Sequence, residues 1–248
     1  MFDNATLNQL RELRLTAMAD GFREQANRGE TSSLSFEERF ALLVDAEWQS
    51  RRNKRTERLV RQAGFRFPAA IENIDWQSKQ GITKPEIIKL SFCSYIKKAQ
   101  NIIISGPTGV GKTYLACALG RTACTHGIQV LYTRLPDFFK RIFNLNLKTS
   151  FQDKCAKVPL LILDDWGLKN FSLEETAALL ELFEKRYEQA STIISGQVPS
   201  SSWHELFPNP TLADAILDRT VHNAHPYSIS GESMRKSIGK RSLESSDS

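Results

Sequence analysis

Apolar and polar residues alternate at helical spacing in the N-terminal quarter of the chain. Leucines recur three residues apart from Leu7 to Leu13, and this spacing predicts one helix before the first polar run. Ser35 and Glu38 have the spacing of a capping box, so a second amphipathic helix is expected to follow. These patterns predict a helical N-terminal domain over residues 1–68.

From about residue 100 onwards, short apolar runs alternate with helical patterns. Such alternation is typical of βαβ units, which build a parallel sheet covered by helices. The expected fold class is therefore α/β over residues 69–240, with a disordered polar tail at 241–248. Strands are expected at 102–104, 128–133, 158–163, 192–195 and 226–229. Helices are expected at 114–120, 135–147, 173–187 and 212–221, with a further helix that ends at 98.

Composition places the chain among ordinary soluble globular proteins. Of its 248 residues 41% are hydrophobic and 25% are charged. No apolar run approaches the roughly 20 residues needed to cross a membrane, so no membrane partner is expected. The four cysteines form no C-x-x-C pair, which favours a reducing cytosol and a cytoplasmic location. A net charge of +5 is a modest hint of a polyanionic partner.

One glycine-rich stretch lies between an apolar run and a helical pattern. Residues 106–113 match the phosphate-loop pattern G-x-x-x-x-G-K-[ST] without a gap. Glycines let the backbone wrap a phosphate with its N–H groups pointing inward, and the following helix adds its positive end. The alternative is a glycine turn that matches by chance. The expected nucleotide-binding residues are Gly106, Pro107, Thr108, Gly109, Val110, Gly111, Lys112, Thr113 and Tyr114.

Two carboxylates follow the apolar run at 160–163. A carboxylate at the end of a strand beside a phosphate loop holds Mg²⁺, so Asp164 and the Thr113 hydroxyl are the expected metal ligands. Lys112 is expected to reach the β- and γ-phosphates of ATP. Asp165, expected on the opposite side of the pleat, is placed to polarise an attacking water. The alternative is that Asp-Asp-Trp-Gly is only a turn. The predicted cofactors are ATP and Mg²⁺.

Polar residues in the last fifth of the chain offer further chemistry. Ser195 or Gln197, at the end of the fourth predicted strand, could orient a water near the γ-phosphate, or either could be an ordinary loop residue. Arg219 and Arg235 could each supply positive charge to the transferring phosphoryl group. Isolated arginines more often form surface salt bridges, which is the alternative for both.

Basic residues gather at the end of the second predicted helix. Residues 51–66 hold seven of them against one acid, Glu57, whereas residues 1–50 are rich in acids. Cations three and four residues apart share one helix face and suit a row of phosphates. The alternative is a solvated helix end. The candidates for DNA contact are Arg51, Arg52, Lys54, Arg55, Arg58 and Arg61.

Several segments together resemble one family. The chain is similar to the IstB-like ATP-binding proteins in GPTGVGKTYLACALG, LLILDDWG, NPTLADAILDRTVHNAH and GESMRK. These proteins are transposition helper ATPases of insertion sequences, related to the helicase loader DnaC within the AAA+ class. The resemblance implies a P-loop NTPase core of the AAA+ type with a reduced C-terminal lid. It also implies hydrolysis of ATP to ADP and phosphate, a homo-oligomer on double-stranded DNA, and a transposase partner.

The same resemblance implies roles for single residues. Arg219 corresponds to an arginine finger that acts on a neighbouring subunit's ATP, and Arg235 to a sensor 2 residue for the chain's own nucleotide. Sensor 1 would be Ser195 or Gln197. Asp165 stands where most AAA+ proteins have glutamate, and its shorter side chain predicts slow hydrolysis. The resemblance adds Lys140, Arg141 and Lys148 to the candidates for DNA contact.

The predicted function is that of a DNA-binding ATPase that assembles on target DNA and helps a transposase. One alternative keeps the ATPase but changes the client, giving a DnaC-like helicase loader in DNA replication. A small-molecule kinase is a third possibility, and Arg219 and the paired aspartates count against it.

Overall fold

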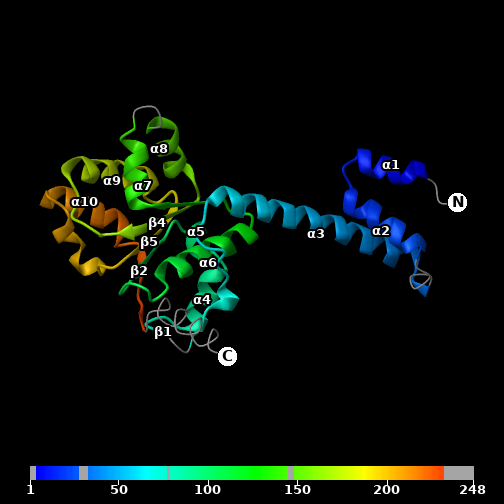
Figure 1. Cartoon of the computed structure of the whole chain (residues 1–248), viewed down its shortest axis with the longest axis horizontal. Coiled ribbons are helices and arrows are strands. Elements are labelled where there is room, and N and C mark those ends of the chain that lie inside the picture. The colour runs from blue at the N-terminus through cyan, green and yellow to red at the C-terminus, as the bar shows by residue number, and fades with distance from the viewer. Residues whose placement is uncertain (1–3, 28–32, 77–78, 145–147, 232–248) are drawn as a thin grey trace, which may run out of the picture. The chain divides into compact units, whose positions relative to one another are not determined.

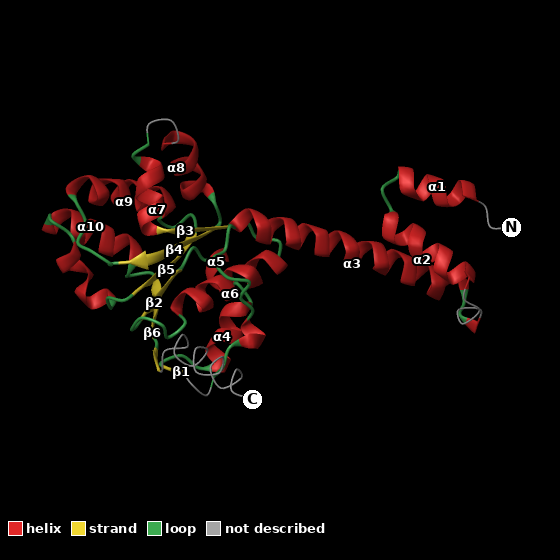
Figure 2. Cartoon of the chain, in the orientation of Figure 1, coloured by secondary structure: helices red, strands yellow, loops and turns green. Residues whose placement is uncertain are grey.

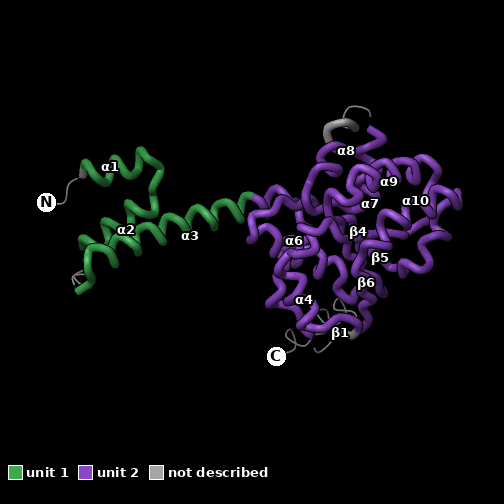
Figure 3. Tube along the Cα trace, turned by 180° about the vertical axis from the view of Figure 1, so that it is seen from behind, with its two compact units in different colours: residues 1–58 green, residues 59–248 purple. Residues whose placement is uncertain are grey.

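The computed structural model describes residues 4–27, 33–76, 79–144 and 148–231. The chain divides into two compact units, a helical unit (residues 1–58) and a sheet unit (residues 59–248), coloured separately in Figure 3. The division falls inside one helix, α3 (Phe36–Ala63), and so earlier than the expected boundary at residue 68. The reason is that Leu59 and Ala63, in the last turns of α3, are buried in the core of the sheet unit.

The helical unit consists of α1 (Asn4–Glu12), α2 (Thr16–Asn27) and the first part of α3. The single first helix expected from the leucine spacing is two helices, because Arg14 takes a left-handed φ of 58° after α1. The capping box at the start of α3 is confirmed. The Glu38 N–H donates to Ser35 Oγ at 3.2 Å, and the Ser35 N–H donates to Glu38 Oε2 at 2.8 Å.

A buried carboxylate joins α3 to α2. Glu47 is 8% exposed and accepts the backbone N–H groups of Ala17 and Met18 at 3.0 and 3.2 Å. Arg51 Nε donates to the same carboxylate at 2.8 Å. The first N–H groups of a helix have no partner within it, so Glu47 caps the start of α2 from another helix.

Five parallel strands form the central sheet of the sheet unit, in the order β3-β4-β5-β2-β6 (Figure 2). They are β2 (Asn101–Ser105), β3 (Val130–Arg134), β4 (Leu160–Trp166), β5 (Ser191–Gly196) and β6 (Ala224–Ser228). The predicted α/β class with a parallel sheet is confirmed. A short antiparallel pair, β1 (Lys79–Gln80) with β7 (Ser230–Gly231), lies outside this sheet.

Helices cover both faces of the central sheet (Figure 1). Ile102 and Ile104 of β2 share a buried cluster with α4 and α6, whereas Ile103 points to the other face and packs in a cluster with α7 to α10. The helices are α4 (Lys84–Ser91), α5 (Ser94–Lys97), α6 (Lys112–Thr125), α7 (Leu135–Ile142), α8 (Lys148–Lys157), α9 (Leu173–Arg186) and α10 (Pro210–Thr220). Two 3₁₀ segments are η2 (Ile71–Asn73) and η3 (Ser200–Leu206).

Two helices of the sheet unit differ from the expectation. The helix expected to end at residue 98 is divided into α4 and α5, because Cys93 between them has a left-handed φ of 56°. The helix expected at 135–147 ends at Ile142, and α8 follows as a helix that the apolar pattern did not predict. Among the described residues, no helix combines the length and the apolar character needed to span a membrane.

An arginine lies at the centre of the cluster that holds α8 and α9 against the sheet. Arg186 is 2% exposed, and its guanidinium donates to the carbonyl oxygens of Cys155 (2.7 Å), Val158 (2.8 Å) and Ser191. Its Nε also donates to Thr192 Oγ1 at 3.0 Å. Burial lowers the pKa of Arg186 to about 10, so the group stays charged at neutral pH. The side chain thereby satisfies the free carbonyls at the end of α8.

Candidate nucleotide-binding site

The phosphate loop runs from the end of β2 to the start of α6, as the sequence predicts. Gly106, Gly109 and Gly111 have φ values of 148°, 90° and 95°, which side chains rarely tolerate. At Gly106 space also demands glycine, because a Cβ would lie 2.0 Å from the carbonyl oxygen of Ile229. The loop therefore presents its backbone at the N-terminal end of α6, where unpaired N–H groups and the helix dipole favour an anion.

Lys112 and Thr113 are the first two residues of α6, and their side chains contact different parts of the site. Lys112 Nζ donates to the carbonyl oxygen of Pro107 at 2.7 Å, so the ammonium lies across the loop. Thr113 Oγ1 donates to Asp164 Oδ1 at 3.1 Å and so connects the loop to β4. The structure thus brings together the two halves of the site that lie 51 residues apart in the sequence.

Asp164 is almost completely buried, at 1% exposure. Besides Thr113, its carboxylate accepts hydrogen bonds from Ser195 Oγ at 2.5 Å and from the Tyr132 hydroxyl at 2.8 Å. Burial, together with the adjacent Asp164 charge, raises the pKa of Tyr132 far above its usual range, so its hydroxyl remains a donor. Three hydroxyls from three elements therefore fix the orientation of one carboxylate.

A bulge in β4 changes where Asp165 points. Leu163 pairs with Ile194 and Trp166 with Gly196, so two residues of β4 lie opposite Ser195 alone. Asp165 has a left-handed φ of 62°, a conformation that aspartate tolerates better than most residues. The sequence expectation that Asp165 lies on the opposite side of the pleat is wrong. The bulge brings its side chain to the same cavity as Asp164.

Two arginines lie close to the Asp165 carboxylate. Arg134, the last residue of β3, donates from Nε to Asp165 Oδ2 at 2.6 Å. This hydrogen bond and the carboxylate charge raise the pKa of Arg134. Arg66 Nη1 lies 3.9 Å from the same oxygen. The sequence pattern gave no signal for Arg134, and Arg66 was only one of the cations counted in residues 51–66.

These residues line a cavity of about 390 Å³ at the C-terminal edge of the sheet. Of the nine expected nucleotide-binding residues, six line this cavity. Gly106, Pro107 and Val110 are part of the loop but do not line it. Ser195 and Gln197 both reach the cavity wall. Ile71, Ile74 and Trp76 pack in or against a buried cluster of the sheet unit and do not line this cavity. The lining residues are Arg66, Phe67, Thr108, Gly109, Gly111, Lys112, Thr113, Tyr114, Asp164, Asp165, Leu168, Ser195, Gly196 and Gln197.

The two late arginines lie away from this cavity or outside the described residues. Arg219, near the end of α10, donates to the Ala215 carbonyl at 2.8 Å and to Glu184 Oε1 at 3.2 Å. It does not line the nucleotide cavity of its own chain. Arg235 lies outside the described residues.

The basic candidates for DNA contact are exposed along α3 and α7. Arg51 and Arg52 already have partners, Glu47 at 2.8 Å and the Trp48 ring at 5.3 Å. Lys54, Arg55, Arg58 and Arg61 are exposed. On α7, Lys140 and Arg141 are exposed, with the Arg141 guanidinium over the Phe151 ring at 4.8 Å. Lys148 begins α8, and its side chain lies outside the described part of the chain.

Comparison with known proteins agrees with this geometry. Residues 8–242 match the family described as IstB-like ATP binding protein. The chain belongs to this family. It is 42% identical to a protein of Sinorhizobium fredii (strain NBRC 101917 / NGR234) named as an insertion sequence ATP-binding protein. That match covers 98% of this chain and 100% of the relative, so the resemblance predicted from the motifs is confirmed.

Solved structures share the fold of this IstB-family chain at low sequence identity. The DnaC helicase loader matches with a TM-score of 0.54 and 19% identity, over 66% of this chain and 98% of the loader. DnaA from Aquifex aeolicus, bound to AMPPCP, matches with a TM-score of 0.53 and 20% identity, over 73% of this chain and 56% of DnaA. At such identities the likeness concerns the fold alone, which is the predicted P-loop fold of the AAA+ type.

The oxygen atoms next to the phosphate loop fit a magnesium ion. Thr113 Oγ1 and Asp164 Oδ1 are 3.1 Å apart, and both border the cavity. A hydroxyl and a carboxylate are the hard oxygen donors that Mg²⁺ prefers, with phosphate oxygens and waters completing its shell. A bound Mg²⁺ would neutralise charge on the phosphates, and these two residues would hold it.

Proposed function

We propose that this protein is an ATPase that assembles on double-stranded DNA and helps a transposase in DNA transposition. The observation that carries the proposal is the meeting of the phosphate loop with both β4 carboxylates in one cavity. A phosphate loop alone accounts only for binding of a nucleotide. A second carboxylate beside the first adds a group that can activate water. Membership of a family whose relatives are named for insertion sequences supports a transposase as the partner.

Six side chains that line the cavity have a proposed task in hydrolysis. Lys112 neutralises the β- and γ-phosphates, and Thr113 with Asp164 holds Mg²⁺. Asp165 accepts a proton from the attacking water as general base. Ser195 orients Asp164 through its hydrogen bond, which leaves the exposed Gln197 at the cavity wall to position the water. Arg134 competes with the water for Asp165, which supports slow hydrolysis in the absence of a neighbouring subunit.

Assembly on DNA is the second part of the proposal. Arg219 lies outside its own cavity, which supports a role as arginine finger toward a neighbouring subunit. The exposed cations of α3 and α7 would contact DNA phosphates and release counterions. ATP then works as a state switch, since its γ-phosphate draws in Arg219 of the next subunit. Arg235 is proposed as the sensor 2 residue, and the protein would act in the cytoplasm.

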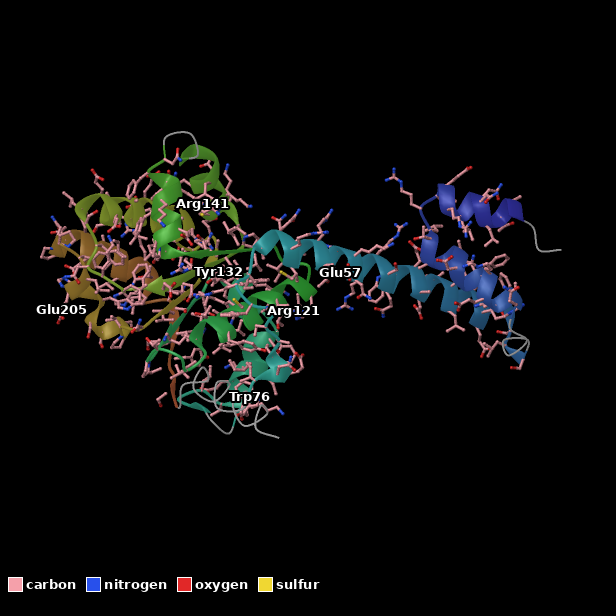
Figure 4. All side chains as sticks on the ribbon, in the orientation of Figure 1. Glu57, Trp76, Arg121, Tyr132, Arg141 and Glu205 are labelled. Carbon is pink, nitrogen blue, oxygen red and sulfur yellow. The ribbon has the colours of Figure 1, made fainter. Side chains whose placement is uncertain are left out.

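The experiment measures ATP turnover with and without double-stranded DNA, together with particle size by light scattering. We expect ATP and DNA together to increase both turnover and particle size. Arg219→Ala should bind ATP as the natural protein does but hydrolyse it at least about 100-fold more slowly, because the transition-state charge loses a cation. The matched control is Arg121→Ala, an exposed arginine on α6 that is labelled in Figure 4.

Two results would contradict this proposal. Natural turnover in Arg219→Ala would remove the arginine-finger role. A particle that keeps the mass of one chain under every combination of ATP and DNA would remove assembly. Pull-down of a replicative helicase in place of a transposase would favour the helicase-loader alternative, in which the protein is still an ATPase.

A further inference from the structure

The segment that follows α3, residues 64–70, crosses one face of α6, the helix that starts at the phosphate loop. We name it the linking segment. The three residues of α6 that it touches are Tyr114, Cys117 and Gly120, which are three apart and so share one face of the helix. The linking segment therefore runs along α6 from its middle toward the phosphate loop.

Three contacts hold the linking segment in place. At Gly120, a Cβ would lie 2.7 Å from the ring of Phe65, so only glycine allows that ring to pack there. The backbone groups of Phe67 and Arg66 lie near the sulfur of the buried Cys117, where they oppose the rise in the pKa of its thiol that burial causes. The backbone of residue 70 is held by the Tyr114 hydroxyl, which lies 3.3 Å from the amide nitrogen and 3.4 Å from the carbonyl oxygen. The backbone on either side of Arg66 is thus fixed against α6.

From this fixed backbone, the side chain of Arg66 reaches the nucleotide cavity. It lines the same cavity as Lys112, and its guanidinium lies over the Phe67 ring at 5.5 Å. Its side chain is 37% exposed. The 3.9 Å separation from Asp165 is longer than a hydrogen bond, so this contact does not satisfy the donors of the guanidinium.

A purely structural ion pair accounts poorly for this arginine. Arg134 already pairs with Asp165 at 2.6 Å, so the carboxylate does not need a second cation. A partly exposed pair at 3.9 Å contributes little to stability. An arginine on a segment that three contacts fix against α6, with its side chain in the wall of a phosphate-binding cavity, is better suited to a ligand with several oxygen atoms.

We propose that Arg66 binds the terminal phosphate of the nucleoside triphosphate and makes the cavity prefer ATP over ADP. The inference rests on the nucleotide site proposed above. Asp165, as the proposed base, lies beside the phosphoryl group that is transferred, so a cation 3.9 Å from Asp165 is near the terminal phosphate. The terminal phosphate would replace Asp165 as the partner of Arg66 and leave the carboxylate with Arg134 alone.

The test measures binding of AMPPCP and of ADP to the full chain by titration calorimetry, each with Mg²⁺. Arg66→Ala should weaken AMPPCP binding by about tenfold or more, because a hydrogen-bonded charge pair is lost, and change ADP binding by less than about twofold. Arg66→Lys should lie between the two, since it keeps the charge without the planar fork. Arg121→Ala, the same change on the exposed side of α6, should bind both nucleotides as the natural protein does.

The possible outcomes separate this inference from the function on which it rests. Equal weakening of AMPPCP and ADP by Arg66→Ala overturns the terminal-phosphate role, as does unchanged binding of both. If the natural protein binds neither nucleotide, the proposed function fails and the inference fails with it. Should Arg66→Ala unfold early in a thermal melt, Arg66→Gln retains most of the stem and provides the same comparison.

Discussion

The two units of this chain differ in how far their apolar side chains are buried. In the sheet unit, both faces of the sheet carry fully buried side chains, among them Ile102, Leu163 and Trp166. In the helical unit, apolar side chains four residues apart on α3 remain exposed. They are Phe36 (68%), Phe40 (50%), Val44 (43%) and Trp48 (54%).

The difference teaches that an amphipathic pattern does not say which face becomes core. In the part of α3 that belongs to the helical unit, the buried positions are Leu43 and Glu47, so a carboxylate takes a place that a pattern would give to an apolar residue. The sheet unit holds a closed core and a complete nucleotide cavity. The helical unit instead carries exposed apolar and basic side chains. The nucleotide cavity therefore lies in one unit, and this row of exposed apolar side chains lies in the other.

The largest effect is expected from removing the buried arginine of the sheet unit. Arg186→Met leaves the carbonyls of Cys155, Val158 and Ser191 without a donor. The free energy of unfolding should fall by about 3–5 kcal/mol, because each unsatisfied buried group carries a desolvation penalty. Urea unfolding followed by tryptophan fluorescence measures this loss. Arg121→Met is the exposed control, and a loss under about 1 kcal/mol for Arg186→Met would contradict the role given to the buried charge.

The second effect tests whether nucleotide chemistry belongs to the sheet unit. Lys112→Ala should lower ATP turnover by about 100-fold, which corresponds to about 2.7 kcal/mol in the barrier, and abolish ATP-dependent assembly on DNA. Thermal stability should stay close to that of the natural protein, since the loop is formed by its glycines. Lys98→Ala, an exposed lysine at the end of α5, is the matched control. Retained assembly in a filter-binding assay would remove the role given to Lys112.

A smaller effect is expected at the surface of the helical unit. The double variant Lys54→Ala with Arg58→Ala should weaken binding to double-stranded DNA by about tenfold. It should also reduce the slope of log affinity against log salt by about two, since each phosphate contact contributes about 0.9. Arg23→Ala, an exposed arginine of α2 that pairs with Asp20, is the control. An unchanged salt slope would place the DNA contact elsewhere.

The smallest effect concerns the carboxylate that caps α2. Burial raises the pKa of Glu47, but hydrogen bonds from Arg51, Met18 and Ala17 more than offset this and lower it below its ordinary 4.5. The stabilisation is therefore present above about pH 4.5 and is lost as the pH falls through the folded value. Glu47→Gln should lower the free energy of unfolding by about 1 kcal/mol at neutral pH and remove the dependence of stability on acidic pH. Far-UV circular dichroism melts across acidic pH measure both, and the same pH dependence in the variant would contradict the assignment.

Local patterns were enough to predict much of the fold and part of the site. The phosphate loop was predicted because its glycines, lysine and threonine are neighbours in the sequence. The central strands β2 and β4 were predicted because a buried parallel strand contains a nearly continuous apolar run. The helix breaks at Arg14 and Cys93 were not predicted, because a left-handed residue other than glycine does not alter the pattern of apolar positions.

By itself, the sequence determined the α/β order, the phosphate loop and the presence of two carboxylates on β4, since each is a property of adjacent residues. Only the tertiary structure decided which side chains meet them. Tyr132, Arg134 and Ser195 reach β4 through strand pairing, and Arg66 through the path of the linking segment over α6. The direction of Asp165 depends on a bulge against β5. Register and close packing between distant segments set these contacts, and neither can be read from spacing along one strand.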